Sequence, residues 1–298
     1  MKKPDFFLVG APKCGTTAMC DYLDQHPEIF ISPIKEPNYF GKDVIGPKAV
    51  NNIEDYLNLF HKAENQLCGE GSVWSLFSKT AAKEIYDFNC NAKIIIMLRN
   101  PVDVIYSLHN QMVFDGYHED IEDFNLALAA ESDRKKGLRI PKTCTRPQAL
   151  IYTDVVKFTE QVQRYIDIFP KENINIIIYD DFKNKTFQIY RNTLNFLGVN
   201  SDFEPDIKVI NASKRVKNKT LQKFLVAQPP VVQFFSKNII PSPLRQTMRT
   251  LLKKINTQYQ PSPPMDTALK KRLQAEFALE VEQLSNLLGR DLTYWSKS

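Results

Sequence analysis

One short segment limits the possible folds more than any other part of the chain. Residues 10–17 read Gly-Ala-Pro-Lys-Cys-Gly-Thr-Thr, between an apolar run at 5–9 and an amphipathic run at 16–26. This order predicts a strand, a tight loop and a helix. Backbone N–H groups then converge at the helix N-terminus, where anions bind well. The charge of Lys13 adds to this field, so we expect a phosphate-bearing ligand here.

The loop departs from the usual nucleoside triphosphatase pattern. That pattern is G-x-x-x-x-G-K-[ST], with lysine directly after the second glycine. Here Thr16 holds that position and the lysine lies inside the loop at Lys13, whereas Thr17 matches the pattern. An ordinary strand-to-helix turn is the alternative, but a lysine, two glycines and two threonines in this context favour a binding loop.

Apolar runs alternate with amphipathic segments along the chain, which predicts parallel strands linked by helices. We expect a single α/β domain over 1–298 with a P-loop-type, three-layer α/β/α architecture, a central parallel sheet and a helical C-terminal third. The expected strands are 5–9, 28–32, 66–70, 93–98 and 174–179. The expected helices are 16–26, 53–62, 75–89, one beginning near Pro101, 148–169 and 186–197.

A second motif follows the clearest buried strand. Residues 94–111 read IIIMLRNPVDVIYSLHNQ, so the strand ends at Arg99 and Ser107 lies on the following helix. An arginine in this position can bind a phosphate through two parallel hydrogen bonds. A surface salt bridge for Arg99 and a helix-surface position for Ser107 are the alternatives for either residue alone.

Together, GAPKCGTT and LRNP with its serine resemble the sulfotransferases that use 3′-phosphoadenosine 5′-phosphosulfate (PAPS). The resemblance continues through YIDIFPKENINIIIYDDF, NTLNFLGV and EVEQLSNLLGRDLTYW, and it is strongest to the carbohydrate-type branch with the heparan sulfate enzymes and many bacterial proteins. It implies that Arg99 and Ser107 hold the 3′-phosphate. It also implies a 5′-phosphosulfate site made of Lys13, Cys14, Gly15, Thr16 and Thr17.

The resemblance also suggests where the acceptor binds. The segment SPIKEPNYF (32–40) is similar to one in which carbohydrate sulfotransferases carry their catalytic base, which places Glu36 in that role. A positioned carboxylate can accept the proton that an attacking hydroxyl loses. A solvated loop glutamate is the alternative. Lys35 is a candidate for a substrate contact, because GEGSVWS (69–75) lacks the lysine that heparan sulfate enzymes have there.

Two further residues of the 69–75 segment are candidates. Glu70 is a second candidate base or an orienting group, and Trp74 either stacks on a ring of a substrate or packs in the core. None of the four histidines lies where the cytosolic relatives have their catalytic histidine. We therefore do not expect a histidine base.

Positive charge is concentrated in one part of the chain. Residues 207–265 contain eleven lysines and arginines and no aspartate or glutamate, whereas the net charge of the whole chain is only +5. The segment NASKRVKN (211–218) resembles a loop that closes over the 3′-phosphate, so Lys214 and Arg215 are candidates there, with a solvated loop as the alternative. A basic amphipathic helix within 237–255 either packs on the core or contacts a membrane or polyanion. No nucleic-acid-reading motif accompanies the charge, so nucleic acid is not an expected partner.

Composition limits the compartment and the metal chemistry. No run of about 18 apolar residues occurs, and the N-terminal apolar stretch is too short for a signal peptide. Five scattered cysteines with no C-x-x-C pair argue against disulfides and a zinc site. We expect a cytoplasmic protein, with peripheral attachment to the inner face of the membrane as an option, and no required metal.

The sequence thus predicts in-line transfer of a sulfuryl group from PAPS to a hydroxyl or amine, with 3′,5′-adenosine bisphosphate as the second product. A carbohydrate or glycan is the favoured acceptor, although a glycolipid or small metabolite is compatible. One alternative is a magnesium-dependent kinase that uses Asp180 and Asp181. Another is a non-enzymatic module that binds membranes or polyanions. The sequence does not predict the oligomeric state.

Overall fold

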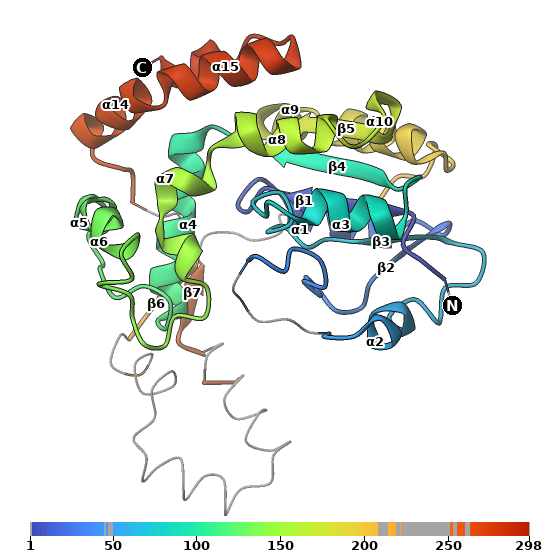
Figure 1. The fold of residues 1–298 in the computed structure, drawn as a ribbon, viewed down its shortest axis with the longest axis horizontal. Helices are drawn as coiled ribbons and strands as arrows, with labels where there is room; N and C mark the ends of the chain where they lie inside the picture. The colour runs from blue at the N-terminus through green and yellow to red at the C-terminus, as the bar shows by residue number, and fades with distance from the viewer. Residues whose placement is uncertain are drawn as a thin grey trace, which may run out of the picture.

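The centre of the fold is a five-stranded sheet in the strand order β2-β3-β1-β4-β5, in which every pair of neighbours is parallel (Figure 1). The computed structural model describes residues 2–44, 46, 50–207, 214–218, 221, 251–252, 255–259 and 263–297. The strands are β1 (Phe6–Gly10), β2 (Ile29–Ile31), β3 (Leu67–Glu70), β4 (Lys93–Leu98) and β5 (Ile174–Ile178). All five expected strands are therefore present.

The middle strands are buried on both faces. All five residues of β1 and the last five of β4 are buried. This is expected for a parallel sheet, because its crossover connections place helices on both faces. The predicted three-layer α/β/α architecture is confirmed, and helices flank the sheet in Figure 1.

The helices of the first two thirds of the chain connect these strands or pack at their ends. Their bounds are α1 (Thr16–Asp24), α2 (Ile53–Asn58), α3 (Ala81–Phe88), α4 (Pro101–Asp115), α5 (Phe124–Ala129), α6 (Glu131–Arg134), η1 (Pro147–Leu150), α7 (Tyr152–Val155), α8 (Phe158–Ile166), η2 (Lys171–Asn173), α9 (Tyr179–Asn184) and α10 (Thr186–Leu197).

Three predicted helices differ clearly from the structure, and one of them, expected over 53–62, ends at Asn58. The helix expected over 75–89 begins only at Ala81, because residues 75–80 are non-helical and the Ser78 hydroxyl accepts the Ala81 amide at 2.9 Å. The long helix expected over 148–169 is divided into η1, α7 and α8. At the second break, the Gln161 side chain donates to the carbonyl oxygen of Val155 at 3.1 Å, and the Thr159 amide donates to Glu280 at 2.7 Å. Backbone groups that a continuous helix would pair with each other therefore find tertiary partners, which a local pattern does not reveal.

The C-terminal third contains the helices α14 (Thr267–Glu276) and α15 (Ala278–Leu288) and the short η3 (Thr293–Ser296). It also contains two strands that the sequence did not predict, β6 (Lys214–Val216) and β7 (Thr257–Tyr259), which pair antiparallel. Most of the basic segment 207–265, including most of 237–255, lies outside the described residues. Leu251, Leu252 and Ile255, from the apolar face of the expected basic helix, are helical and exposed.

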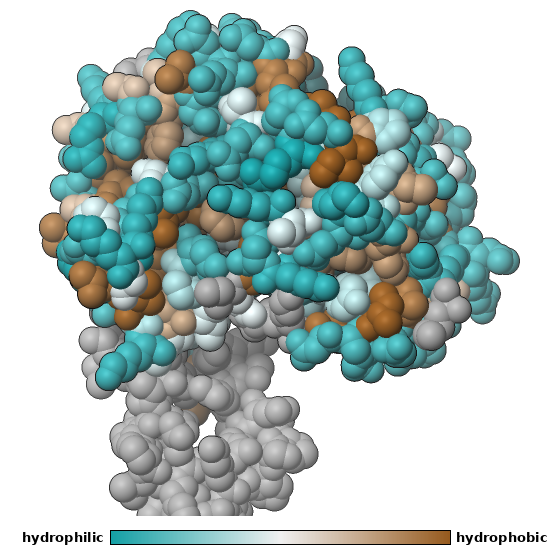
Figure 2. Space-filling view, in the orientation of Figure 1, coloured by the Kyte–Doolittle hydropathy of each residue, from teal (hydrophilic) through white to brown (hydrophobic). Residues whose placement is uncertain are grey.

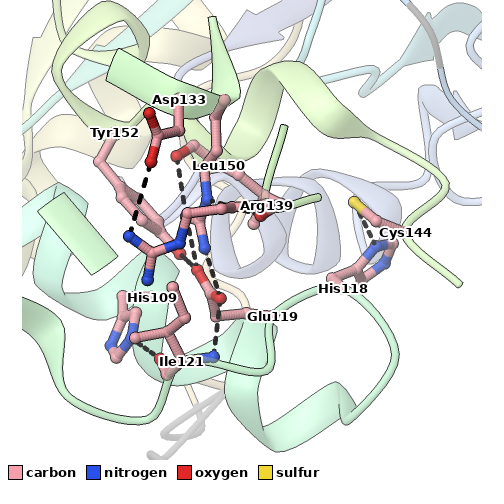
Figure 3. A network of polar contacts seen from close by, with 10 residues as sticks. His109, His118, Glu119, Ile121, Asp133, Arg139, Cys144, Leu150 and Tyr152 are labelled. Carbon is pink, nitrogen blue, oxygen red and sulfur yellow. Dashed lines mark hydrogen bonds and ion pairs between the residues drawn. The ribbon is translucent and has the colours of Figure 1, made fainter. Parts of the chain in front are cut away.

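A buried ion pair joins α6 to the loop that follows α4 (Figure 3). Arg134 Nη2 and Nη1 donate to the two carboxylate oxygens of Glu119 at 2.7 and 2.8 Å. Tyr152 Oη donates to the same carboxylate at 2.7 Å, and the Ile121 amide donates to it at 2.9 Å. We call these residues (Glu119, Ile121, Arg134, Tyr152) the Glu119 network.

The face of the molecule shown in Figure 2 is mostly hydrophilic, and its apolar side chains lie in small separate patches. Within the described part of the chain, no helix combines the length and the apolar character needed to cross a bilayer.

Candidate active site

The loop after β1 places backbone donors at the start of α1. Gly15 precedes this helix in a left-handed conformation (φ 86°), and no side chain of the described residues caps the first turn. The first N–H groups of a helix have no partner within it, so they are free to bind an anion. A side chain at Gly15 would be strained at this φ, and its Cβ would lie 3.1 Å from the Tyr179 ring. The predicted loop and helix start are thus present at Gly15, Thr16 and Thr17, and phosphate binding by these residues stays a prediction.

Lys13 lies inside this loop, also with a positive φ of 66°. Its Nζ donates to Gln111 Oε1 of α4 at 2.7 Å. Burial lowers the pKa of Lys13, although Asp115 opposes this effect, and the nearby charges of Arg99 and Lys35 lower it further. Three cations therefore lie close together around the loop, which favours a ligand with several negative charges.

The predicted 3′-phosphate residues lie next to Lys13. Arg99 follows the last residue of β4, its Nη1 donates to the Lys13 carbonyl oxygen at 3.4 Å, and its guanidinium lies over the Tyr179 ring at 4.8 Å. Ser107 is partly exposed on α4. Since residues four apart share one helix face, Ser107 lies between Asp103, which pairs with Arg99, and Gln111, which binds Lys13. Lys13, Arg99 and Ser107 thus line one side of α4.

Cys14 and the pair Lys214 and Arg215 contribute differently. The Cys14 side chain is fully buried, and burial raises the pKa of its thiol to about 12, so only its backbone can face a ligand in the loop. Lys214 and Arg215 are the first residues of β6, which packs against α4. The structure therefore places their backbone near the helix that carries Ser107.

The predicted acceptor residues approach the same loop from the segment after β2. Lys35 Nζ donates to Thr17 Oγ1 at 2.9 Å. Burial raises the pKa of the half-buried Glu36, while the charges of Lys35, Arg146 and Lys13 act in the opposite direction. Glu36 also has a left-handed backbone (φ 54°), which is rare for a glutamate and concentrates at functional sites when the surroundings enforce it.

Glu70 is connected to the Glu36 segment by a series of hydrogen bonds. It is the last residue of β3, only 2% exposed, and accepts a hydrogen bond from Ser72 Oγ at 2.7 Å. Ser72 Oγ in turn accepts the Asn38 amide at 3.0 Å, and the Asn38 side chain donates to the Glu36 carbonyl oxygen at 2.8 Å. Burial raises the pKa of Glu70 to about 7, although the bond from Ser72 opposes this shift. The chain Glu70–Ser72–Asn38 therefore fixes the conformation of the Glu36 segment.

Trp74 is 7% exposed, and the Arg146 guanidinium lies over its ring at 4.6 Å. Sequence reasoning missed Arg146. It follows several other lysines and arginines in the chain, so no local pattern separated it from solvated surface charges. Its proximity to Glu36 depends on the tertiary fold, and only the structure reveals it.

The two aspartates that the kinase alternative would use to hold magnesium contact side chains of the C-terminal region instead. Asp181 forms an ion pair with Arg290, and Asp180 accepts a hydrogen bond from Trp295 Nε1 at 2.9 Å. Within the described ranges, no three His, Cys, Asp or Glu side chains cluster in a way that could hold a metal ion. His109 is buried, with a ring nitrogen 2.9 Å from the Ile121 carbonyl oxygen, and lies outside the group around Lys13 and Glu36.

The candidate residues around the loop lie at or beyond the carboxyl ends of four parallel strands. Lys13 follows β1, Lys35 and Glu36 follow β2, Glu70 ends β3 and Arg99 follows β4. Ligands of open α/β sheets bind at this edge. The fold and the arrangement of these groups are therefore those expected of a protein that binds a nucleotide-type polyanion beside a carboxylate.

Comparison with known proteins gives the family. The profile of the family described as "Sulfotransferase domain" matches residues 3–240, so the chain belongs to this family and the predicted resemblance is confirmed. A crystal structure of a sulfotransferase from Alicyclobacillus acidocaldarius has the same fold, with a TM-score of 0.74, 29% identity and full coverage of both chains.

Curated relatives are similar over shorter stretches. Carbohydrate sulfotransferase 15 of Homo sapiens is 29% identical over 165 residues, which are 41% of this chain and 29% of that protein. The bifunctional heparan sulfate N-deacetylase/N-sulfotransferase 1 of Caenorhabditis elegans is 22% identical over 190 residues, or 61% of this chain and 20% of that protein. The matched stretches thus span less than a third of the length of these relatives.

Proposed function

We propose that this chain transfers a sulfuryl group from PAPS to a hydroxyl or amine of a carbohydrate acceptor, with Glu36 as the general base. The observation that carries the proposal is the convergence of Lys13, Arg99 and Glu36 beyond one edge of the sheet. Family membership supports the reaction class, and the names of the carbohydrate and heparan sulfate relatives support the acceptor class.

The nucleotide would be held from two sides. The α1 amides, Lys13, Thr16 and Thr17 would bind the 5′-phosphosulfate, and Arg99 and Ser107 the 3′-phosphate. During transfer, negative charge grows on the phosphate oxygen that leaves sulfur. Preorganised N–H donors and the Lys13 ammonium at that oxygen would stabilise the transition state without the need for a metal ion. Lys214 and Arg215, on β6, are candidates to close over the 3′-phosphate.

The acceptor would approach sulfur from the Glu36 side. As its hydroxyl attacks, the oxygen–sulfur bond forms, the bond from sulfur to the phosphate oxygen breaks, and Glu36 accepts the hydroxyl proton. Burial makes Glu36 more basic than an exposed glutamate, because its pKa is raised. Lys35, which already contacts Thr17, would lie between the two substrates. Glu70 would position the base rather than act as one, because it is almost fully buried.

Calorimetry with two nucleotides tests the proposal against the kinase alternative. We expect the protein to bind 3′,5′-adenosine bisphosphate without added metal, and more tightly than ATP with magnesium. Lys13→Ala should weaken bisphosphate binding roughly 10- to 100-fold, since a hydrogen bond to a charged group contributes about 1.5–3 kcal/mol. Lys62→Ala, at an exposed lysine remote from the loop, is the matched control. Binding of ATP with magnesium but not of the bisphosphate would reject the proposal.

A further inference from the structure

A small cavity lies beside the Glu36 segment. Asn38, Gly46, Trp74 and Arg146 are among its lining residues, and its volume is about 10 Å³. A cavity needs roughly this volume to admit one water-sized group. The space therefore fits a single oxygen atom. One of its lining residues, Asn38, is two positions along the chain from Glu36, the proposed base.

The Arg146 guanidinium is a buried positive charge with a donor, Nη1, that is unused by the described residues. Arg146 is only 6% exposed, and none of the described residues accepts a hydrogen bond from its buried Nη1. Leaving a buried charge without a hydrogen-bonded partner is costly, so such groups are normally paired or bind a ligand. Trp74 covers one face of the guanidinium but cannot accept its N–H groups in the plane. The cavity and the unused donor are thus two separate signs of a missing partner.

Gly46 allows the backbone to approach the guanidinium closely. A Cβ at this position would lie 2.7 Å from both Nε and Nη2 of Arg146. Any side chain there would push the guanidinium out of its present position. The site is therefore enclosed by a glycine on one side and an indole ring on the other, which leaves the cavity as the direction from which a partner can enter.

We propose that Arg146 binds an anionic substituent of the acceptor, a carboxylate or a sulfate group, one oxygen of which enters this cavity. This inference rests on the proposed function and specifies its acceptor as an acidic saccharide. The nucleotide does not explain the site, because its phosphates are assigned to Lys13, Arg99 and Ser107. Asn38 lines the cavity and also binds the Glu36 carbonyl oxygen, so the anionic substituent lies near the hydroxyl that Glu36 deprotonates.

Binding of three matched glycosides tests this site. The protein, saturated with 3′,5′-adenosine bisphosphate, is titrated calorimetrically with 4-nitrophenyl β-D-glucuronide, with the 6-sulfate of 4-nitrophenyl β-D-glucoside and with the unmodified glucoside. The first carries a carboxylate, the second a sulfate and the third no charge. We expect at least one anionic glycoside to bind roughly 10-fold or more tightly than the neutral one, which corresponds to one charge-assisted hydrogen bond. The stronger of the two anions identifies the substituent.

Variants then assign the preference to Arg146. Arg146→Met should bind all three glycosides equally, Arg146→Lys should keep part of the preference, and Arg191→Met, at a half-exposed arginine, should behave as the unmodified protein. Gly46→Ala should also lose the preference by displacing the guanidinium. Affinity for the bisphosphate should stay constant in every variant, which also shows that each one folds.

Equal affinity for the three glycosides, or no measurable binding of any of them, would overturn the inference and leave a bound water as the occupant. A preference that survives in Arg146→Met would overturn it as well. These outcomes differ from a failure of the proposed function, which would appear as a lack of bisphosphate binding.

Discussion

Two buried arginines of this protein have opposite surroundings. Arg134, 2% exposed, donates to both carboxylate oxygens of Glu119 and to the Leu150 carbonyl oxygen. Arg146, 6% exposed, has a buried N–H group for which no described residue is an acceptor. The carboxyl groups near these two arginines also differ, in the direction in which their pKa values are shifted. The pKa of Glu119 is lowered, because hydrogen bonds from Arg134, Ile121 and Tyr152 outweigh the effect of burial, whereas burial raises the pKa values of Glu36 and Glu70.

This difference distinguishes charged groups that stabilise the fold from charged groups that are available to bind a ligand. In the Glu119 network each charged group has a partner within the chain, so its removal should affect stability. The charged groups of what we call the acceptor-side cluster are half-buried Glu36 and the buried Glu70 and Arg146, and none of them forms a direct ion pair with a described residue. Their removal should affect binding and turnover, with little loss of stability or even a gain.

The largest expected effect is on turnover, from Glu36→Gln. A general base contributes about 10²- to 10⁴-fold to rate, so kcat should fall by this factor. The amide retains the shape of the side chain, so affinity for 3′,5′-adenosine bisphosphate and the unfolding free energy should stay unchanged or rise slightly. The measurement is transfer of labelled sulfate from PAPS to 4-nitrophenyl β-D-glucuronide, followed by calorimetry and urea unfolding.

Glu54→Gln, at an exposed position on α2, is the control for this substitution and should retain full turnover. Normal kcat in Glu36→Gln would exclude Glu36 as the base. A large loss of stability would place Glu36 with the Glu119 network and remove the distinction between the two regions.

The parts of the molecule that sequence reasoning predicted correctly depend on local signals. The buried run of β4 and the loop at 10–17 each carry their pattern within a few residues, so strand, loop and helix follow from periodicity and glycine placement. The division of the helix expected over 148–169 depends instead on Glu280, which is 121 residues from its partner Thr159. No window of sequence contains both residues.

The site residues that could be predicted from the sequence also depend on local signals. Lys13 and Arg99 belong to short motifs, and their contact could be expected because both follow neighbouring parallel strands. Arg146 and Arg134 are similar in sequence context, since both come from a stretch rich in lysine and arginine. Only packing gives one of them Glu119 and leaves the other beside Glu36 and Trp74.

A stability comparison of the two arginines should give the next largest effect. Arg134→Met leaves the Glu119 carboxylate buried without its cation, which typically costs about 3–5 kcal/mol. Arg146→Met removes a charge that burial already disfavours, as its pKa of about 10 shows. Loss of its contact with Trp74 and relief of desolvation oppose each other, so we expect a change within about 1 kcal/mol. Urea unfolding at neutral pH measures both.

Glu119→Gln combined with Arg134→Met should recover part of the stability lost in Arg134→Met, because the amide is neutral and still accepts from Tyr152. If Arg146→Met proved as destabilising as Arg134→Met, Arg146 would be a structural residue and the contrast would fail.

The smallest expected effect is a difference in pH dependence between the two buried carboxyls. Glu70 keeps its proton in the folded state up to a pKa of about 7, whereas an unfolded glutamate ionises near 4.5. Between these values the folded state binds more protons, so ionisation of Glu70 makes the protein less stable as pH rises. Glu70→Gln removes this dependence while its amide oxygen still accepts from Ser72. The variant should therefore gain stability relative to the unmodified protein as pH rises from 4.5 to 7, by at most about 3 kcal/mol.

Glu119→Gln should instead lose stability relative to the unmodified protein as pH rises. The lowered pKa of Glu119 provides stability that is lost on acidification, and the variant lacks this contribution. Urea unfolding at several pH values, with Glu54→Gln as the flat control, measures both slopes. Parallel slopes for Glu70→Gln and Glu119→Gln would mean that the two regions hold their carboxyl groups in the same way.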